Sequence, residues 1–514
     1  MTTSNGLWIN WAGNLAACPS AILQPPDVAA LQTIIKNNQG RVVRAVGTGH
    51  SWSPIAFTGP NDLLIDTSQM TENGSKAWRW QQNGLNLVTF VPSALWSDVR
   101  DALTTSSNPA PQMYLPTAGV LPSINATGFV AAGCHGTGWN QPTVSDLIYA
   151  IEIVAADGEV HLFSEDTTPA EMPIVRVSLG TLGVISKVTL KVVPLYHLHD
   201  QEGSQVTANV MGPNPESSGS VDPTALANLV VTNEYVELFW FPWSGWSFGS
   251  SELSDGQIWT KVFNTTLDPP RNVPPQPPDW QIWFADVLMA QVALWPTSSA
   301  ARAGVPLVES GVWSSLSGSI AAIEKTDGYV GTAPEVLHYQ DKAFPVIDLE
   351  MAVPIPPSAN SQGWDFTNVV TAWYQVVNYV KAQYKNSSYP LTCCVHARFI
   401  KNSQSLLSPA YEPAGSDVHY CWIEFLSAYP KENCQPADLA PFQELIDETA
   451  PTWITQFKGR PHWGKYWQSI PGIRENIHTY YPPDNLTAFN TLRKQMDPDG
   501  MFLTAFLKGL NLFV

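Results

Sequence analysis

Side chains that could do chemistry stand in a few short stretches of this chain. The first is Gly47-Thr48-Gly49-His50-Ser51, which follows the strand-like run RVVRAV at residues 41–46. Glycines directly after a strand allow a tight turn whose backbone N–H groups point into one concavity, which suits a pyrophosphate. The pattern is not the Rossmann fingerprint, because no G-x-G-x-x-G opens a helix. Taken alone, the stretch is more typical of a loop with a partly exposed histidine.

A second stretch, residues 115–140, is rich in small residues. Its sequence LPTAGVLPSINATGFVAAGCHGTGWN contains Gly119, Gly128, Gly133, Gly136 and Gly138. Small residues let a chain pass close against a long planar ligand. The alternative is a strand-turn segment of ordinary packing. Combined with the first stretch, it favours the wall of a cofactor site.

Two further stretches carry basic side chains. In GRPHWGKYW, residues 459–467, His462 and Lys465 are three apart and could bring an imidazole and an ammonium into one pocket. In VHARF, residues 395–399, strand alternation puts His396 and Arg398 on one face. A lone His-x-x-Lys pair is usually found on a surface, so this stretch does not by itself indicate a site.

The same alternation pairs His419 with Cys421 in VHYCWIEFL. Burying Arg398 without a partner would be costly, so polar pairs on apolar strands need a reason. Either they form a site, or a carboxylate such as Glu424 or Asp348 satisfies the arginine. The residues alone leave both alternatives open.

The elements that must position these stretches alternate between helices and strands. Residues 26–40 have apolar residues at helical spacing and end at a glycine. Residues 143–163 read as two strands joined at Asp157-Gly158, and 179–194 as a glycine-flanked strand run. Beyond residue 196 come proline-rich loops and aromatic-rich strands. Helix-strand alternation with hairpins predicts an α+β class.

Length and charge bound the possibilities further. The 514 residues predict two domains, and a net charge of −18 argues against nucleic-acid binding. The most apolar run, residues 280–295, is interrupted by Asp286 and two glutamines and predicts a core helix, so we expect no integral membrane segment. The six cysteines lack metal-finger spacing, and we expect no metal. No signal peptide is visible, which predicts a cytoplasmic protein.

In this order, the stretches resemble the aldonolactone and alditol oxidase branch of the vanillyl-alcohol-oxidase-type flavoproteins. GTGHS is similar to the FAD loop of that family, whose histidine is covalently joined to the flavin. GVLPSINATGFVAAGCHGTG and LGTLGVISKVTLKVVP are similar to its second and third FAD segments, and HWGK to the C-terminal signature of the branch. The resemblance covers the first 195 and last 60 residues well and is thin from about 200 to 340.

The resemblance implies a two-domain FAD-binding fold of the PCMH type with an antiparallel-sheet cap. The expected division is an FAD-binding domain at 1–195, a substrate or cap domain at 196–455, and a C-terminal segment, 456–514, that returns to the FAD domain. It also implies FAD joined to His50. The expected FAD-binding residues are Val46, Gly47, Thr48, Gly49, His50, Ser51, Gly119, Asn125, Gly128, Phe129, Gly133, His135, Gly183, Ile185 and His462.

By the same resemblance, Lys465 and His419 stand near the reacting hydroxyl and Arg398 orients the substrate. We expect Lys465 to stabilise developing negative charge and His419 to act as the base. His396, Val120 and Cys421 are expected in the substrate site. They depart from the family pattern, which usually has Glu-x-Arg for His396-Ala397-Arg398, a serine in the alditol oxidases for Val120, and commonly a hydroxyl residue for Cys421.

These residues predict an FAD-dependent oxidase that removes hydride from a CH–OH carbon of a polyol, sugar lactone or related alcohol and reduces O2 to H2O2. Its partners would be that small molecule and dioxygen. The alternatives are a dehydrogenase with a non-oxygen acceptor and an oxidase of a secondary-metabolite alcohol or C–N bond. A non-catalytic sugar-binding protein that has lost flavin is a further alternative.

Overall fold

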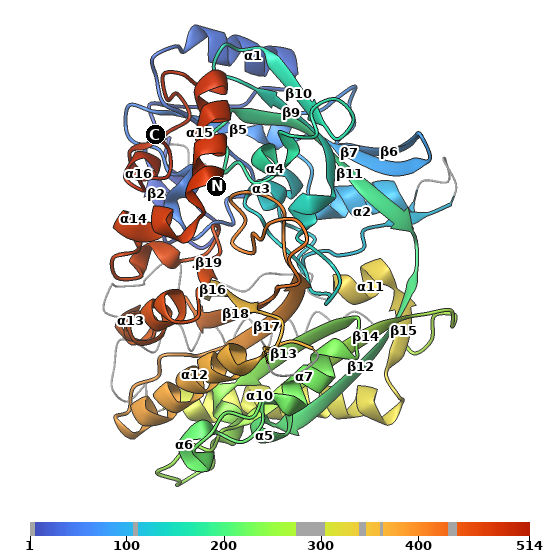
Figure 1. Cartoon of the computed structure of the whole chain (residues 1–514), viewed down its shortest axis with the longest axis vertical. Coiled ribbons are helices and arrows are strands. Elements are labelled where there is room, and N and C mark those ends of the chain that lie inside the picture. The colour runs from blue at the N-terminus through green and yellow to red at the C-terminus, as the bar shows by residue number, and fades with distance from the viewer. Residues whose placement is uncertain (1–5, 106–110, 274–303, 339–345, 360–362, 430–438) are drawn as a thin grey trace.

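A computed structural model describes residues 6–105, 111–273, 304–338, 346–359, 363–429 and 439–514. The apolar run at 280–295, predicted to be a core helix, lies outside these ranges. The N-terminal sheets and the C-terminal helices form one end of the molecule, and a large antiparallel sheet with its helices forms the other (Figure 1). The predicted α+β class is confirmed.

The N-terminal part contains two sheets. The first is parallel, in the order β3 (Ala21–Leu23), β5 (Leu63–Asp66), β4 (Val43–Val46), and helix α1 (Val28–Asn37) buries Leu31 and Ile35 in a core shared with this sheet. The second is antiparallel, in the order β10 (Val160–Ser164), β9 (Ile148–Val154), β11 (Val184–Pro194), β7 (Leu85–Phe90), β6 (Ala77–Gln82), with β8 (Met113–Tyr114) on β11. The short helices of this part are α2 (Trp96–Thr104), α3 (Ala126–Ala131) and α4 (Met172–Val175), and a small ribbon pairs β1 (Trp8–Ile9) with β2 (Ala16–Ala17).

Among the described residues the cap is one eight-stranded sheet. Its order is β15 (Tyr329–Thr332), β12 (His197–Val206), β14 (Gln257–Thr266), β13 (Tyr235–Phe241), β17 (Cys394–Lys401), β18 (His419–Ala428), β16 (Val346–Ile355), β19 (Arg460–Pro461). All of its pairings are antiparallel, as predicted for the cap. Because side chains alternate along each strand, the register decides which polar residues share a face.

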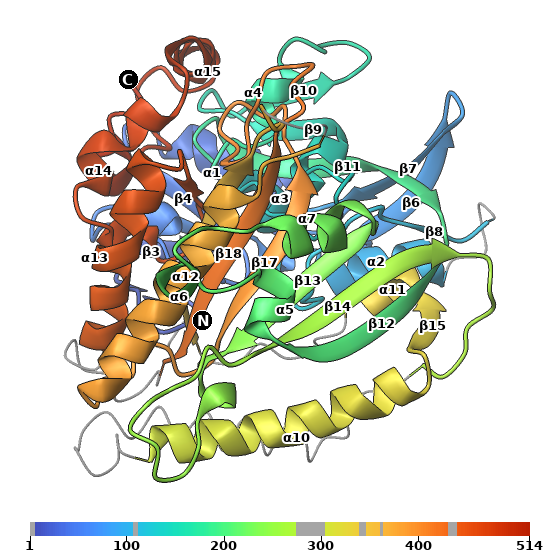
Figure 2. The same ribbon diagram turned by 60° about the horizontal axis from the view of Figure 1, so that its bottom comes forward.

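Helices surround this sheet. Helix α10 (Val305–Lys325) runs beside β12, as Figure 2 shows, and α12 (Thr367–Lys385) packs against β16 and α13 (Ala440–Thr455). The smaller helices are α5 (Thr207–Met211), α6 (Pro215–Ser218), α7 (Thr224–Val231) and α11 (Ala333–Leu337). No helix within the described ranges is long and apolar enough to cross a membrane.

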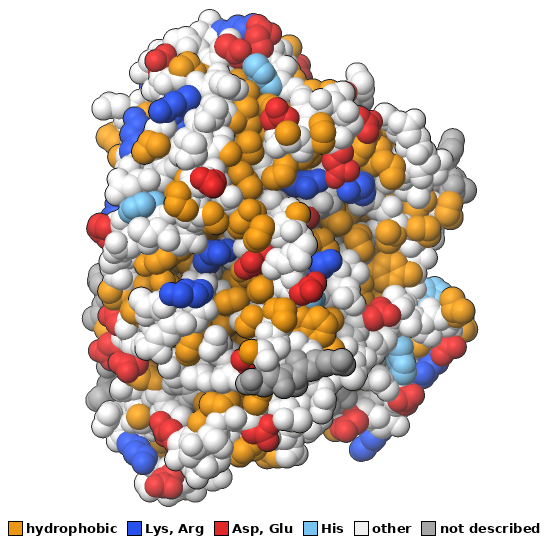
Figure 3. Space-filling view, in the orientation of Figure 1, with side chains coloured by type: hydrophobic (Ala, Val, Ile, Leu, Met, Phe, Trp, Pro, Cys, Tyr) orange, Lys and Arg blue, Asp and Glu red, His pale blue; other side chains and the backbone are white. Residues whose placement is uncertain are grey.

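The C-terminal residues return to the N-terminal part after leaving the cap sheet at β19. They form α14 (Ile473–Asn476), α15 (Pro483–Met496) and α16 (Ala505–Lys508). The backbone N–H of Val43 donates to the carbonyl of Met501 (2.8 Å), and that of Ala156 to the carbonyl of Met496 (2.9 Å). On the face drawn in Figure 3, acidic and basic side chains are interspersed, so the charge of −18 does not form one acidic patch there.

Candidate active site

A cavity of about 630 Å³ is lined by residues of both the N-terminal part and the cap. Its N-terminal wall consists of the turn after β4, the segment around α3 and the turn before β11. Its cap wall consists of residues from β13, β14, β16, β17, β18 and α10, together with His462, Gly464 and Lys465. Binding cavities of this size are typical of small-molecule and cofactor sites.

The turn after β4 is held by the segment that caps α3. Gly49 has a φ of +70°, a conformation that favours glycine, and the hydroxyl of Thr48 accepts from the backbone N–H of Asn125 (3.2 Å). The Asn125 side chain caps α3 by accepting from the N–H of Gly128 (2.8 Å). A Cβ added at Gly47 would lie 2.4 Å from Asn125 Cγ, so only glycine fits between the two segments.

The turn before β11 completes the N-terminal wall. Gly183 has a φ of +147°, and a Cβ there would lie 2.4 Å from the carbonyl oxygen of Val154. Buried Arg44 holds this turn by donating to the carbonyls of Leu179 (2.7 Å), Gly180 (2.7 Å) and Phe502 (3.0 Å). Three backbone segments therefore line one cavity, and Gly47 and Gly183 let these segments pack closely on the chain around them. A wall formed largely by backbone suits a long cofactor.

His50 lies in this wall. It lines the cavity, and its ring stacks on Trp11 with centroids 4.7 Å apart and an interplanar angle of 12°. The backbone N–H of Trp11 donates to the carbonyl of Gly49 (2.8 Å), so the residue that stacks on His50 is hydrogen-bonded to the same turn. The imidazole is thus supported on one face and has a fixed position at the cavity.

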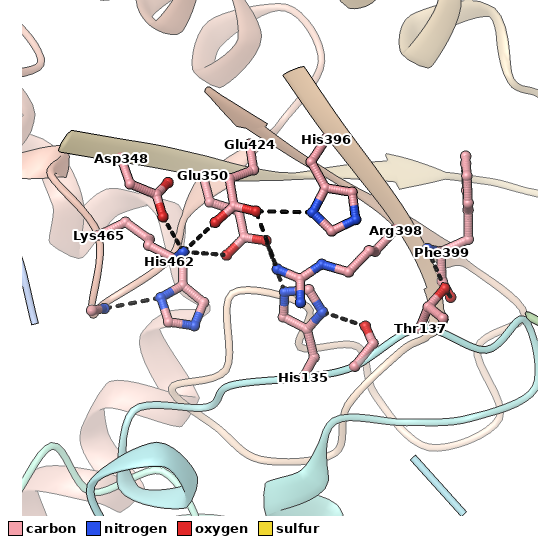
Figure 4. A network of polar contacts seen from close by, with 12 residues as sticks. His135, Thr137, Asp348, Glu350, His396, Arg398, Phe399, Glu424, His462 and Lys465 are labelled. Carbon is pink, nitrogen blue, oxygen red and sulfur yellow. Dashed lines mark hydrogen bonds and ion pairs between the residues drawn. The ribbon is translucent and has the colours of Figure 1, made fainter. Parts of the chain in front are cut away.

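The cap wall contains a cluster of charged side chains (Figure 4). Lys465 Nζ contacts carboxylate oxygens of both Asp348 and Glu424. Arg398 Nη2 donates to Glu350 Oε1 (2.6 Å) and lies 3.6 Å from Glu424 Oε2. The strands bring these groups together, because Glu350 on β16 is opposite Glu424 on β18, which is opposite His396 on β17.

Burial and neighbouring charges set the protonation of the carboxyl groups. Burial and the adjacent Glu424 raise the pKa of Asp348 well above its usual range. Burial also acts against the charged form of Glu424, but Lys465, the hydrogen bond with His396 and Arg398 outweigh it and lower the pKa of Glu424. The raised pKa of Asp348 favours its protonated form, and the lowered pKa of Glu424 favours its carboxylate. Similarly, Arg398 and His135 overcome burial and lower the pKa of Glu350.

Burial and neighbouring charges also raise the pKa of some basic groups and lower that of others. Burial opposes the charge of Lys465, but Asp348 and Glu424 raise its pKa, so it stays an ammonium. His396 is desolvated too, but its hydrogen bonds to Glu237 and Glu424 (Nδ1–Oε2, 3.1 Å) raise its pKa. Burial lowers the pKa of His462 to about 3, and burial and Arg398 lower that of His135. The cluster thus contains fixed cations, ionised carboxylates and one neutral carboxylic acid.

The structure brings most of the predicted site residues to this one cavity. Those that line it are Val46, Gly47, Thr48, Gly49, His50, Ser51, Gly119, Val120, Asn125, Gly128, Phe129, His135, Gly183, Ile185, His396, Arg398, His462 and Lys465. Gly133 does not line it, and a Cβ there would lie 3.3 Å from Val177 Cγ2. Its role is therefore in packing against Val177.

His419 and Cys421 also lie outside the cavity lining, which corrects two expectations. Along β18 they alternate with Glu424, so their side chains leave the opposite face of the sheet. His419 stacks on Trp139 with centroids 3.9 Å apart, and its Nδ1 donates to the carbonyl of Asp417 (3.0 Å). Cys421 is fully buried in the hydrophobic core. Neither side chain lines the cavity that Arg398 and Lys465 line.

The carboxylates Asp348 and Glu350 were not predicted as site residues. Alternation in VIDLEMAV puts both on one face of β16, and this signal could have identified them. Glu350 Oε2 is buried, and among the described residues no group donates a hydrogen bond to it. Within those same ranges, no group of three or more His, Cys, Asp or Glu side chains is placed to hold a metal ion.

A glycine-lined cavity in an FAD-binding fold, facing a charged cap cluster, defines an FAD-dependent oxidoreductase. The FAD binding domain profile matches residues 19–164, and that of D-arabinono-1,4-lactone oxidase matches residues 188–510, more than half of the chain. The chain belongs to the D-arabinono-1,4-lactone oxidase family, which confirms the resemblance seen in the sequence.

Individual relatives are distant but extend over nearly the whole chain. The protein is 26% identical to an L-gulono-1,4-lactone dehydrogenase of Mycobacterium tuberculosis, covering 98% of each chain. It is 22% identical to an L-gulonolactone oxidase of Scyliorhinus torazame, covering 97% of each. Among solved structures, a solvent-stable cholesterol oxidase superposes with a TM-score of 0.74 at 17% identity, covering 98% of this chain and 97% of the other. This last likeness shows a shared fold.

The raised pKa of Asp348 predicts a pH-dependent effect of Asp348→Asn. Wild-type Asp348 contributes stability below the carboxyl pKa of the unfolded chain, about 4, and this contribution is lost as the pH rises through the raised folded-state pKa. Asparagine keeps the neutral form and does not titrate. We expect the melting temperature of the variant, relative to wild type, to increase with pH above about 4. If the difference in melting temperature between the variant and wild type stays constant from pH 4 to 9, Asp348 is ionised in the folded protein.

Proposed function

We propose that the protein is an FAD-dependent oxidase that takes a hydride from a CH–OH carbon and reduces O2 to H2O2. The substrate class is a polyol, sugar lactone or related alcohol. One observation carries this proposal: Lys465, Arg398 and an oxygen of Glu350 that accepts no hydrogen bond from the described residues meet at the wall of the glycine-lined cavity. Bound FAD would supply the two-electron acceptor, and the chain supplies orientation and charge.

Glu350 and Lys465 are the groups that would handle the hydroxyl. Glu350 Oε2 lies 4.0 Å from Lys465 Nζ, so a hydroxyl donating to this oxygen would also lie beside the ammonium. Arg398 occupies the other oxygen of Glu350 and fixes the carboxylate plane. As hydride leaves carbon, the hydroxyl becomes strongly acidic, so a carboxylate of low pKa can accept its proton. Lys465 and Arg398 stabilise the partial negative charge that the substrate oxygen carries where its proton leaves ahead of the hydride, and the oxygen ends as a neutral carbonyl.

Cofactor attachment is proposed at His50, the imidazole that lines the cavity in the turn GTGHS. The residues that would hold FAD are those of the three N-terminal segments, and they fit it through the glycine positions described above. Stacking on Trp11 holds the imidazole at the cavity wall.

A covalent tether predicts that flavin stays with the protein after denaturation. Trichloroacetic-acid precipitation of wild type should give a yellow pellet, and a peptide containing His50 should carry the mass of FAD. His50→Ala should release the colour or yield apoprotein, whereas His161→Ala, at a partly exposed histidine of β10, should not. A yellow acid pellet from His50→Ala would place the tether elsewhere, with Cys134 the next candidate.

Lys465→Met should leave flavin bound and slow its anaerobic reduction by substrate, on the order of 10²–10³-fold, as expected for one lost transition-state donor. Stopped-flow absorbance of the flavin measures this rate. Lys465→Arg keeps a positive charge beside Asp348 and Glu424 and should recover part of the rate of flavin reduction. Lys494→Met, at an exposed position of α15, is the matched control. An unchanged reduction rate in Lys465→Met would leave Lys465 with a structural role alone.

The oxygen acceptor is tested at Gly119. Gly119 lines the cavity in which FAD would bind, and we propose that oxygen reaches the flavin past this glycine, so a side chain here should slow reoxidation. However, a Cβ at Gly119 would lie 2.6 Å from the ring of Phe129, so Gly119→Ala also disturbs packing. The double variant Gly119→Ala/Phe129→Leu makes room for the methyl group and separates the two effects.

We expect reduced wild type to reoxidise rapidly in oxygenated buffer and both variants to reoxidise slowly, with flavin reduction nearly unchanged. Recovery in the double variant alone would show that Gly119 serves packing against Phe129. Slow reoxidation of wild type would instead favour a dehydrogenase with another acceptor, the activity named in the Mycobacterium tuberculosis relative.

A further inference from the structure

The cap wall of the cavity has two chemically different ends. The charged end comes from β17, β18 and β16 together with Lys465. The other end comes from β13, β14 and α10, and its residues are Phe239, Phe241, Trp259, Val312 and Leu316. The sheet order β14-β13-β17-β18-β16-β19 puts the two ends side by side, and they meet where β13 pairs with β17. A substrate whose hydroxyl reaches Lys465 would therefore extend its remaining part toward β13, β14 and α10.

The aromatic side chains of this end are fixed before any ligand binds. Phe239 stacks on His396, with centroids 4.1 Å apart and an angle of 9°, and on Trp259, with centroids 4.8 Å apart and an angle of 27°. The indole N–H of Trp259 donates to Glu202 Oε2 (3.0 Å), and Glu202 is held by buried Lys261 (2.5 Å). The polar edge of the indole is thus already satisfied within the protein.

Polar groups are scarce at this end of the described cavity lining. Ser315 and Ser319 on α10 are the hydroxyl residues there, and Ser319 already donates to the carbonyl of Ser315 (3.4 Å). The neighbouring lining residues Cys393, Cys394 and Leu426 are apolar or weakly polar. A polyhydroxylated body placed here would lose its hydrogen bonds to water without replacement, whereas an apolar ring would bury its surface favourably.

We propose that the substrate carries its reacting CH–OH group on an apolar ring, alicyclic or aromatic, and that the wall formed by Phe239, Phe241, Trp259, Val312 and Leu316 receives that ring. The inference rests on the proposed function for the oxidation of the CH–OH carbon. It narrows the alcohol class and excludes polyhydroxylated compounds, both polyols and sugar lactones, as the preferred substrates.

Matched pairs of alcohols test this preference in the flavin-loaded enzyme. Cyclohexanol, cyclohexylmethanol, benzyl alcohol and decahydro-2-naphthol form the apolar set. Myo-inositol, sorbitol, L-gulono-1,4-lactone and D-arabinono-1,4-lactone form the polyhydroxylated set. Anaerobic flavin reduction gives a second-order rate constant for each compound. We expect the best apolar ring to exceed the best polyhydroxylated compound by at least about tenfold, the lower range for pocket discrimination of small apolar groups.

A binding measurement tests the preference for an apolar ring independently of alcohol oxidation. The tertiary alcohol 1-methylcyclohexanol cannot lose a hydride from its carbinol carbon, so calorimetry reports its binding alone. We expect a dissociation constant at least about tenfold below that of myo-inositol, with a negative heat-capacity change. Faster reduction by the polyhydroxylated set, or tighter binding of myo-inositol, would overturn the ring inference and leave the proposed oxidation intact. Tight binding of 1-methylcyclohexanol with no flavin reduction by any alcohol would sustain the inference about the wall and overturn the proposed oxidation.

Variants of Leu316 locate the effect at the apolar wall. Leu316→Gln introduces an amide and should reduce the apolar-to-polyhydroxylated rate ratio by about tenfold or more, while Leu316→Met conserves volume and should retain it. Phe248→Gln, at a side chain that is 89% exposed and outside the cavity lining, is the surface control. Equal rate ratios in Leu316→Gln, Leu316→Met and wild type would show that this wall does not contact the substrate.

Discussion

The contact of Lys465 with Asp348 and Glu424 is the interaction on which the site depends, because it joins three parts of the chain. The backbone on either side of Lys465 is bound to β16: the His462 N–H donates to the Glu350 carbonyl (2.9 Å) and the Tyr466 N–H to the Asp348 carbonyl (2.7 Å). The same segment also contacts the cofactor turn. The Gly464 carbonyl accepts from the backbone N–H of Trp52 (2.8 Å), which stands two residues beyond His50. The segment that delivers the ammonium therefore also fixes the cofactor turn against the cap.

The sequence predicted the parts of this arrangement that depend on backbone shape. GTGHS and the glycines around α3 predict that chain segments approach one another closely. The structure shows why glycine is needed, because a Cβ at Gly47 would clash with Asn125 and one at Gly183 with Val154. The alternation in VHARF correctly placed His396 and Arg398 together. Such local patterns are readable because turn geometry and strand period depend on neighbouring residues in the chain.

The sequence could not decide which face of β18 meets the cavity. His419 and Cys421 share one face and Trp422 and Glu424 the other, and alternation gives no sign of which face is inside. That choice follows from the pairing of Glu424 with His396 and Glu350, a register between strands that are far apart in sequence. The roles of Asp348 and Glu350 depend on the same register. The sequence therefore misassigned or missed the site residues whose place depends on pairing between distant strands.

The register also accounts for a histidine at position 396, where the family resemblance implies Glu-x-Arg. This position lies opposite Glu424, and His396 Nε2 is 3.7 Å from Glu237. A carboxylate at 396 would stand between two other buried carboxylates, where like charges raise the free energy of the ionised forms. An imidazole with a raised pKa instead accepts a proton and balances them. Lys465 and, after it, His396 lower the pKa of Glu424, and the His396 ring is also the platform on which Phe239 stacks. One substitution therefore links the charged end of the cavity to its apolar end.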